Sequence, residues 1–128
     1  MKYIHSKNFV YCDLKPDNVL VWKYPKPDTQ WSASADASVW VKIADYGISK
    51  QVSPQGLYGM EGTLPYMPPE IILHGGQETY STKMDIYAFG MFIYYLISFR
   101  SPFEDLDEPI TAILREGNRP SLINVSCM

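Results

Sequence analysis

The feature that most limits the possible folds is a long apolar stretch in the second half of the chain. Residues 86–97 form an apolar run interrupted only by Gly90. Ser81 and Thr82 precede the run, and either side chain can cap the start of a helix. The pattern predicts a helix over about residues 82–98, and a helix that is apolar nearly all round is expected to be buried. The run is too short to cross a bilayer, so we expect no membrane span.

The composition is that of one folded domain. The chain has 128 residues, of which 46% are hydrophobic and 20% charged, and its 11 basic and 14 acidic side chains give a net charge of −3. A net negative chain lacks the general positive field that attracts nucleic acid, so we expect no nucleic-acid partner. Cys12 and Cys127 do not make a disulfide framework, and the first residues lack a signal peptide's apolar segment. These features favour a cytoplasmic protein.

Two short β-branched runs predict strands on either side of a loop. The runs are residues 19–22 and 39–43, and the loop between them, residues 23–38, contains two Pro and a Ser/Ala/Asp cluster. Residues 44–70 contain four Gly and four Pro without a sustained period, which predicts an ordered loop with one short helical turn.

The two ends of the chain predict further helix. Residues 1–8 have the character of the end of a helix, and residues 108–116 predict a short amphipathic helix that Gly117 ends. The expected fold class is α+β. Because two short strands and one apolar helix do not enclose a core, we expect the chain to be part of a larger domain.

Four motifs carry the candidate chemistry. They are Tyr-Cys-Asp-Leu-Lys-Pro-Asp-Asn at 11–18, Asp-Tyr-Gly at 45–47, Pro-Pro-Glu at 68–70 with Gly-Thr at 62–63 before it, and Asp-Ile-Tyr-Ala-Phe-Gly at 85–90. In this order the motifs resemble the catalytic loop, magnesium motif, activation-segment end and buried-helix motif of the eukaryotic protein kinases. The resemblance covers essentially the whole chain.

The resemblance implies a role for each chemical side chain. Asp13 would orient the incoming hydroxyl and accept its proton, while Lys15 would offset charge on the γ-phosphate of ATP. Asn18 and Asp45 would supply the hard oxygen ligands that Mg²⁺ prefers. Gly47 would let the chain turn sharply after the metal ligand.

The resemblance also divides the chain. Residues 1–128 would be a partial kinase domain with a catalytic loop at 11–18, an activation segment at 45–70 and a buried helix at about 82–98. This is a mainly helical carboxy-terminal lobe with a short β-hairpin carrying the two loops, and the amino-terminal lobe is absent. The activation-segment residues of interest are Tyr46, Gly47, Thr63, which we expect to be structural, and Glu70.

Six residues would support the site. The resemblance places Leu20 under the adenine ring with Phe92 and Leu96 packed below it. Tyr11 and Tyr46 would stack in a second apolar column. Asp85, which starts the buried-helix motif, would bind the backbone of the catalytic loop.

Finer features are similar to the leucine-rich-repeat kinases of the Roco family, which are tyrosine-kinase-like serine/threonine kinases. These features are Asp-Tyr-Gly in place of Asp-Phe-Gly and the sequences at 17–22, 43–49 and 61–63. Membership would imply ATP, Mg²⁺ and a protein substrate, with an amino-terminal lobe and GTPase and repeat domains in the parent protein. Cys12 replaces an Arg that normally binds a phosphate on the activation segment, so phosphate-driven ordering is in doubt.

Three functions compete at this point. The first is phosphoryl transfer to serine and threonine hydroxyls by a complete domain, with the isolated chain inactive. The second is a truncated or degenerate pseudokinase that works as a scaffold. The third, a structure like the aminoglycoside phosphotransferases, lacks a counterpart of the Pro-Pro-Glu segment.

Overall fold

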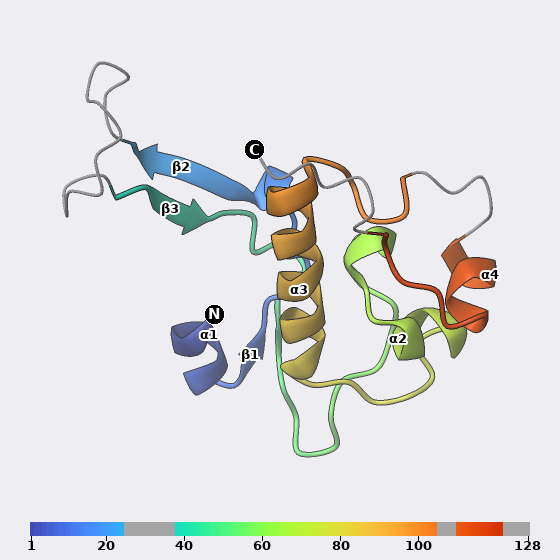
Figure 1. The fold of residues 1–128 in the computed structure, drawn as a ribbon. Helices are drawn as coiled ribbons and strands as arrows, with labels where there is room; N and C mark the ends of the chain where they lie inside the picture. Colours follow the sequence, from blue (N-terminus) through green and yellow to red (C-terminus); the bar gives the residue numbers. More distant parts are fainter. Residues whose placement is uncertain (25–37, 105–109, 122–128) are drawn as a thin grey trace.

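Helix α3, Lys83–Ser98, stands at the centre of the fold (Figure 1). The computed structural model describes residues 1–24, 38–104 and 110–121. The helix confirms the prediction from the apolar run to within a residue. Thr82 occupies the N-cap position without a side-chain capping bond, whereas the Ser81 hydroxyl accepts a hydrogen bond from the backbone N–H of Lys83 at 3.4 Å. Phe99, in the left-handed region at φ 55°, ends the helix.

The prediction that this helix is buried all round is wrong for the described residues. Met84, Asp85 and Ala88 are buried and form one face. A stripe on other faces is exposed and contains Ile86, Phe89, Ile93, Leu96 and Ile97. Most of the core contacts therefore come from the first two turns of α3.

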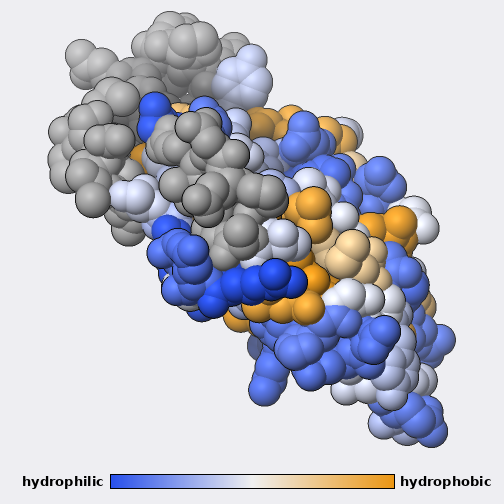
Figure 2. All heavy atoms as spheres, turned by 90° about the vertical axis from the view of Figure 1, so that its right-hand side faces the viewer, coloured by the Kyte–Doolittle hydropathy of each residue, from blue (hydrophilic) through white to orange (hydrophobic). Residues whose placement is uncertain are grey.

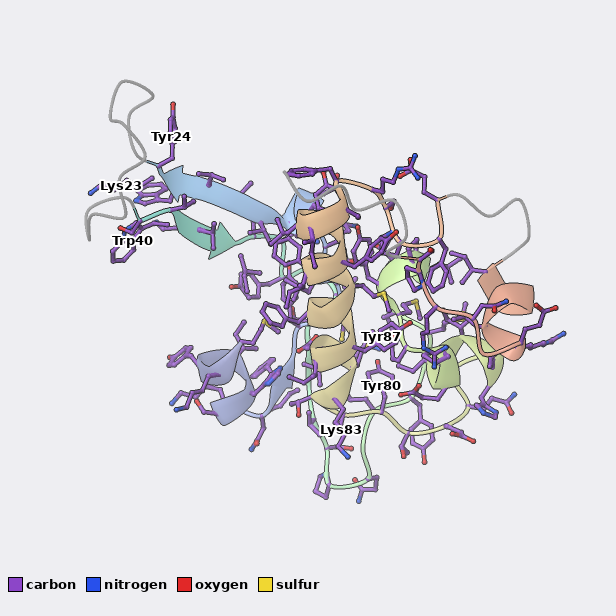
Figure 3. The ribbon with its side chains drawn as sticks, viewed as in Figure 1. Lys23, Tyr24, Trp40, Tyr80, Lys83 and Tyr87 are labelled. Carbon is purple, nitrogen blue, oxygen red and sulfur yellow. The ribbon has the colours of Figure 1, made fainter. Side chains whose placement is uncertain are left out.

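Strands β2, Val19–Lys23, and β3, Trp40–Ile43, form the expected antiparallel hairpin. Val19 pairs with Ile43 and Val21 with Val41, and a bulge follows between Val21 and Lys23. The hairpin projects away from α3, with Lys23, Tyr24 and Trp40 near its far end (Figure 3). Most of the loop predicted between these strands, residues 25–37, lies outside the described residues.

A second, smaller sheet was missed by the sequence reasoning. Strand β1, Phe9–Val10, pairs antiparallel with β4, Lys50–Gln51, so that Val10 faces Lys50. Each strand has two residues, which is too short to show an alternating pattern. The pairing fixes the start of the catalytic loop beside the segment that follows Asp-Tyr-Gly.

The remaining elements are short. The 3₁₀ turns η1, Pro16–Asn18, and η2, Leu64–Tyr66, lie in the catalytic loop and in the 44–70 segment, where one helical turn was predicted. Helix α1 is Lys2–Ser6, in agreement with the helical character of residues 1–8. Helix α2, Pro69–Leu73, had no sequence prediction.

Helix α4, Ile110–Arg115, lies within the predicted 108–116 helix, and Gly117 follows it at φ 77°. Residues 108 and 109 of that prediction lie outside the described residues. Helices α2 and α4 contact each other on one side of α3 (Figure 1). On the face seen from that side, hydrophobic residues gather between larger areas of hydrophilic ones (Figure 2).

Two hydrophobic clusters hold these elements together. One contains Val10, Cys12, Met67, Ile71, Ile72, Tyr80, Met84, Phe103 and Leu114. The other contains Tyr11, Leu14, Tyr66 and Ala88. Tyr11 and Cys12 are neighbours in the chain but belong to different clusters, so the start of the catalytic loop packs against both clusters. Among the described residues, none of the helices has the length and apolar character needed to cross a membrane.

Candidate active site

The catalytic loop is anchored to α3 through one buried carboxylate. Asp85 is fully buried, and its two oxygens accept hydrogen bonds from the backbone N–H groups of Tyr11 and Cys12, each at 2.9 Å. The Nε2 atom of His5 lies 2.7 Å from the same carboxylate. The sequence analysis predicted that Asp85 binds the backbone of the catalytic loop, but it did not predict the contact with His5. The only indication for His5 in the sequence was its position a few residues before the loop.

The anchored loop has an unusual backbone. Cys12 lies in the left-handed region at φ 74°, which a residue with a side chain seldom adopts. Hydrogen bonds from two consecutive backbone N–H groups, those of Tyr11 and Cys12, to Asp85 hold this conformation. It turns the chain so that Asp13, the next residue, leaves the core and faces the 44–70 segment.

Asp13 is the centre of a small polar network. Its Oδ1 atom accepts a hydrogen bond from the Thr63 hydroxyl at 2.6 Å, and its Oδ2 atom lies 3.0 Å from the Lys15 ammonium. The amide nitrogen of Asn18 donates to Oδ2 and to the Asp13 carbonyl, both at 2.9 Å. Lys15 also donates to the Thr63 hydroxyl at 2.8 Å. The structure therefore brings Asp13, Lys15, Asn18 and Thr63 together.

This network sets the charge state of Asp13. Burial alone would raise the pKa of the carboxyl, but hydrogen bonds from Thr63, Lys15 and Asn18 outweigh it and lower the pKa below its ordinary value. Asp13 is therefore ionised at neutral pH. An ionised carboxylate can accept a hydrogen bond from an incoming hydroxyl and orient it.

The hairpin brings the Asp-Tyr-Gly loop alongside the catalytic loop. The Ala44 N–H donates to the Asn18 carbonyl at 2.9 Å, just beyond the Val19–Ile43 pair. The Tyr11 hydroxyl donates to the Ala44 carbonyl, and the Ser49 hydroxyl donates to the Tyr11 carbonyl at 3.1 Å. These bonds place Asp45 beside the loop that contains Asn18.

Gly47 lies in a turn closed by a hydrogen bond from the Ser49 N–H to the Tyr46 carbonyl at 3.1 Å, but its φ does not require glycine. The left-handed backbone falls on Asp45, at φ 53°, and Gly47 is not among the residues with positive φ. The Gly47 N–H instead donates to Oδ1 of Asp45 at 3.1 Å. A side chain at Gly47 would bring its Cβ within 3.2 Å of that oxygen, so Gly47 leaves room for the Asp45 carboxylate.

The donor atoms of Asn18 and Asp45 fit a magnesium ion. The amide nitrogen of Asn18 makes both of its bonds to Asp13, so the oxygen is the end left to face a cation. Asp45 is exposed and carries a second carboxylate oxygen beyond the one bonded to Gly47. In the described part of the chain, no three acidic, His or Cys side chains gather as a metal site. A magnesium ion here would need oxygens from nucleotide phosphates and water, as Mg²⁺ commonly does.

The residues that were expected to support the site differ in their contacts and in their exposure. The rings of Tyr11 and Tyr46 contact each other edge to face, with centroids 5.3 Å apart. Leu20 and Leu96 are exposed and Phe92 is partly buried, and none of the three belongs to either hydrophobic cluster of the described residues. The packing of Phe92 and Leu96 beneath Leu20 stays a prediction.

The sequence analysis missed a second polar cluster in the 44–70 segment. The Lys50 ammonium lies 2.5 Å from Oε1 of Glu61, and the Tyr80 hydroxyl donates to Oε2 at 2.9 Å. Spacing along the chain gave no signal for this contact, because the three residues come from separate parts of the fold.

A cavity of about 450 Å³ lies away from Asp13. Residues at the turn 54–56, the start of α2 and the start of α3 line it, and Glu70 is one of them. Neither Asp13 nor Asn18 nor Asp45 contributes to its wall. We therefore assign the candidate chemistry to the two loops and not to this cavity.

The fold and the two loops define a class of protein. The chain matches the protein kinase domain family over residues 1–125, and it belongs to that family. This confirms the resemblance drawn from the four motifs and places the small α+β structure in a known family.

Individual relatives show which protein kinases this chain resembles. The chain is 40% identical to leucine-rich repeat serine/threonine-protein kinase 1 of Caenorhabditis elegans over 124 residues, 96% of this chain and 5% of that protein. It is 40% identical to the mouse protein of that name over 95% of this chain and 6% of the relative. It is 33% identical to the Drosophila melanogaster ovarian-specific serine/threonine-protein kinase Lok, over 82% of this chain and 20% of that protein. The chain thus spans a small part of each relative, and the similarity to leucine-rich-repeat kinases is confirmed.

Proposed function

We propose that the chain carries the catalytic and metal-binding loops of a protein kinase that transfers the γ-phosphoryl group of ATP to serine and threonine hydroxyls. The observation that carries the proposal is the network of Asp13 with Lys15, Asn18 and Thr63, set beside Asp45. Phosphoryl transfer depends on positioning and on neutralising charge, and this arrangement supplies groups for both.

Each residue has a distinct task in this proposal. Asp13 accepts a hydrogen bond from the substrate hydroxyl and receives its proton, and Lys15 offsets charge on the transferring phosphoryl group. Asn18 and Asp45 hold Mg²⁺, which neutralises charge on the nucleotide phosphates when it is bound. Thr63 bridges Asp13 and Lys15, so it fixes the distance between them.

The chain is best understood as the carboxy-terminal lobe of the kinase domain. It contains the catalytic loop at 11–18 and the activation segment at 45–70, and its Leu20 would lie under the adenine ring. The exposure of Leu20 and of the α3 stripe supports this proposal, since other parts of a complete kinase domain would cover these apolar surfaces. Glu70, which lines the cavity, would there receive an Arg from another segment. The 128 residues alone would then lack phosphotransferase activity, because the amino-terminal lobe supplies the groups above the phosphates.

The relatives suggest the setting of this domain. Two of them are named leucine-rich repeat kinases, and a repeat region and a GTPase domain would by analogy accompany this chain in a cytoplasmic protein. The substrate would be a protein with an exposed serine or threonine.

The test is phosphoryl transfer by a complete kinase domain that carries this chain. Wild-type protein should phosphorylate a generic serine/threonine substrate with ATP and Mg²⁺. Asp13→Asn keeps the shape and removes the proton acceptor, so turnover should fall at least about 100-fold with little change in nucleotide affinity. Asp17→Asn, a change to an exposed carboxylate of the same loop, is the matched control. Wild-type turnover in Asp13→Asn would show that the proton-acceptor assignment is wrong. An inactive wild-type protein that still binds partners would favour the scaffold.

A further inference from the structure

The activation segment of this chain is held by a carboxylate of its own. Glu61 lies two residues before Thr63 and contacts the Lys50 ammonium, from the start of the same segment, at 2.5 Å and the Tyr80 hydroxyl, from outside it, at 2.9 Å. Lys50 belongs to β4, and Tyr80 lies just before α3 (Figure 3). The side chains of Lys50 and Glu61 are 36% and 30% exposed, so water screens the pair only in part.

The backbone around Glu61 leaves no room for a larger neighbour. Gly59, at φ 111°, lies so close that a Cβ there would come within 2.9 Å of Oε2 of Glu61. Gly76, at φ 72°, packs directly on the Gly59 backbone, and its carbonyl accepts the Gly59 N–H at 2.9 Å. The carboxylate therefore packs closely against Gly59 as well as bonding to Lys50 and Tyr80.

From Glu61 the chain passes straight onto the catalytic loop. Gly62, at φ 118°, lies so close to Cys12 that a Cβ would meet the Cys12 carbonyl at 2.7 Å. The next residue, Thr63, donates to Asp13 and accepts from Lys15. A shift of Glu61 would therefore move Thr63 away from both residues to which the proposed function assigns the chemistry.

The charge states of Glu61 and Cys12 are consistent with this geometry. Hydrogen bonding from Lys50 lowers the pKa of Glu61, which keeps the carboxylate ionised at neutral pH. Position 12, where the motif would have Arg, holds a buried Cys, which cannot supply a cation; burial raises its pKa to about 12, so the thiol stays neutral. A phosphate added to this segment would compete with Glu61 for the Lys50 ammonium.

We propose that Glu61 is a positioning residue that orders the activation segment by binding Lys50 and Tyr80, so that the segment needs no added phosphate to hold Thr63 on Asp13. This proposal rests on the proposed function for its effect on turnover. The order of the segment is a separate property that can be measured without activity.

The first test is a charge swap in a complete kinase domain that carries the chain. Lys50→Glu and Glu61→Lys each place like charges together and should lower kcat at least about tenfold, with less than about a threefold change in KM for ATP. The double variant restores an opposite pair and should recover kcat to within about threefold of wild type. Tyr80 can still bond to it, because a hydroxyl both donates and accepts. Glu78→Lys, which reverses an exposed carboxylate 3.6 Å from His74, is the matched control and should leave kcat unchanged.

The second test does not depend on activity. Glu61→Gln removes the charge with little change in shape. The backbone amides of Tyr66 and Met67, which bond to Thr63 and Leu64, should exchange with solvent at least about tenfold faster in this variant. Amides of the β2–β3 hairpin should be unaffected. Unchanged exchange at Tyr66 and Met67, or single charge reversals that retain wild-type kcat, would overturn the role of Glu61. An inactive wild-type protein would overturn the proposed function, while the exchange measurement would still decide the role of Glu61.

Discussion

Removing the Asp85 carboxylate should release the catalytic loop from α3. Asp85→Ala leaves the N–H groups of Tyr11 and Cys12 without their acceptor, and both residues are buried. A buried donor without a partner costs about 1–3 kcal/mol, so the two together should cost about 2–6 kcal/mol. The free energy of unfolding of an ordinary domain is about 5–15 kcal/mol, so this loss is a large part of the total stability.

A graded series makes this estimate testable. Asp85→Asn keeps one acceptor oxygen and should lose about half as much free energy of unfolding as Asp85→Ala. Asp17→Ala removes an exposed carboxylate of the same loop and should change stability by less than about 0.5 kcal/mol.

The assay is urea unfolding of a complete kinase domain that carries the chain. With a slope of about 2 kcal/mol per molar urea, the midpoint of Asp85→Ala should fall by about 1–3 M. If Asp85→Ala unfolds at the same urea concentration as Asp17→Ala, the carboxylate does not anchor the loop and the reasoning is refuted.

Three further predictions concern the loops. Asp45→Ala should abolish the Mg²⁺ dependence of nucleotide affinity in calorimetric titration, since it removes the charged ligand, and an unchanged dependence would disprove the assignment. The pKa values of Asp13 and Glu61 are lowered in the folded chain from ordinary values of 3.8 and 4.5. The stabilisation that these two carboxylates contribute is therefore complete above about pH 5 and is lost as pH falls through their folded pKa values. The thermal unfolding midpoint should decrease as the pH is lowered below about 4, and a midpoint that stays constant down to about pH 2 would contradict this. Phosphatase treatment of the full-length enzyme should change activity less than about tenfold, because Cys12 offers a phosphate no cation; a much larger loss would show that phosphate does order the segment.

Local sequence predicted the elements whose signals are continuous along the chain. The apolar run with its polar start predicted α3, and the β-branched runs predicted β2 and β3 close to their observed ends. Motif order also predicted the family, because four short patterns at fixed intervals seldom occur together by chance. These are properties of neighbouring residues, which the sequence displays directly.

Contacts between distant residues could be decided only by the tertiary structure. No pattern in the sequence joins Glu61 to Lys50 and Tyr80, or His5 to Asp85, since each contact depends on how separate elements pack. The positive φ at Asp45, which no sequence pattern indicated, likewise follows from two loops fixed side by side by the hairpin. Burial of α3 depends in the same way on which elements surround it, and the sequence of the helix alone records its apolar character but not its neighbours.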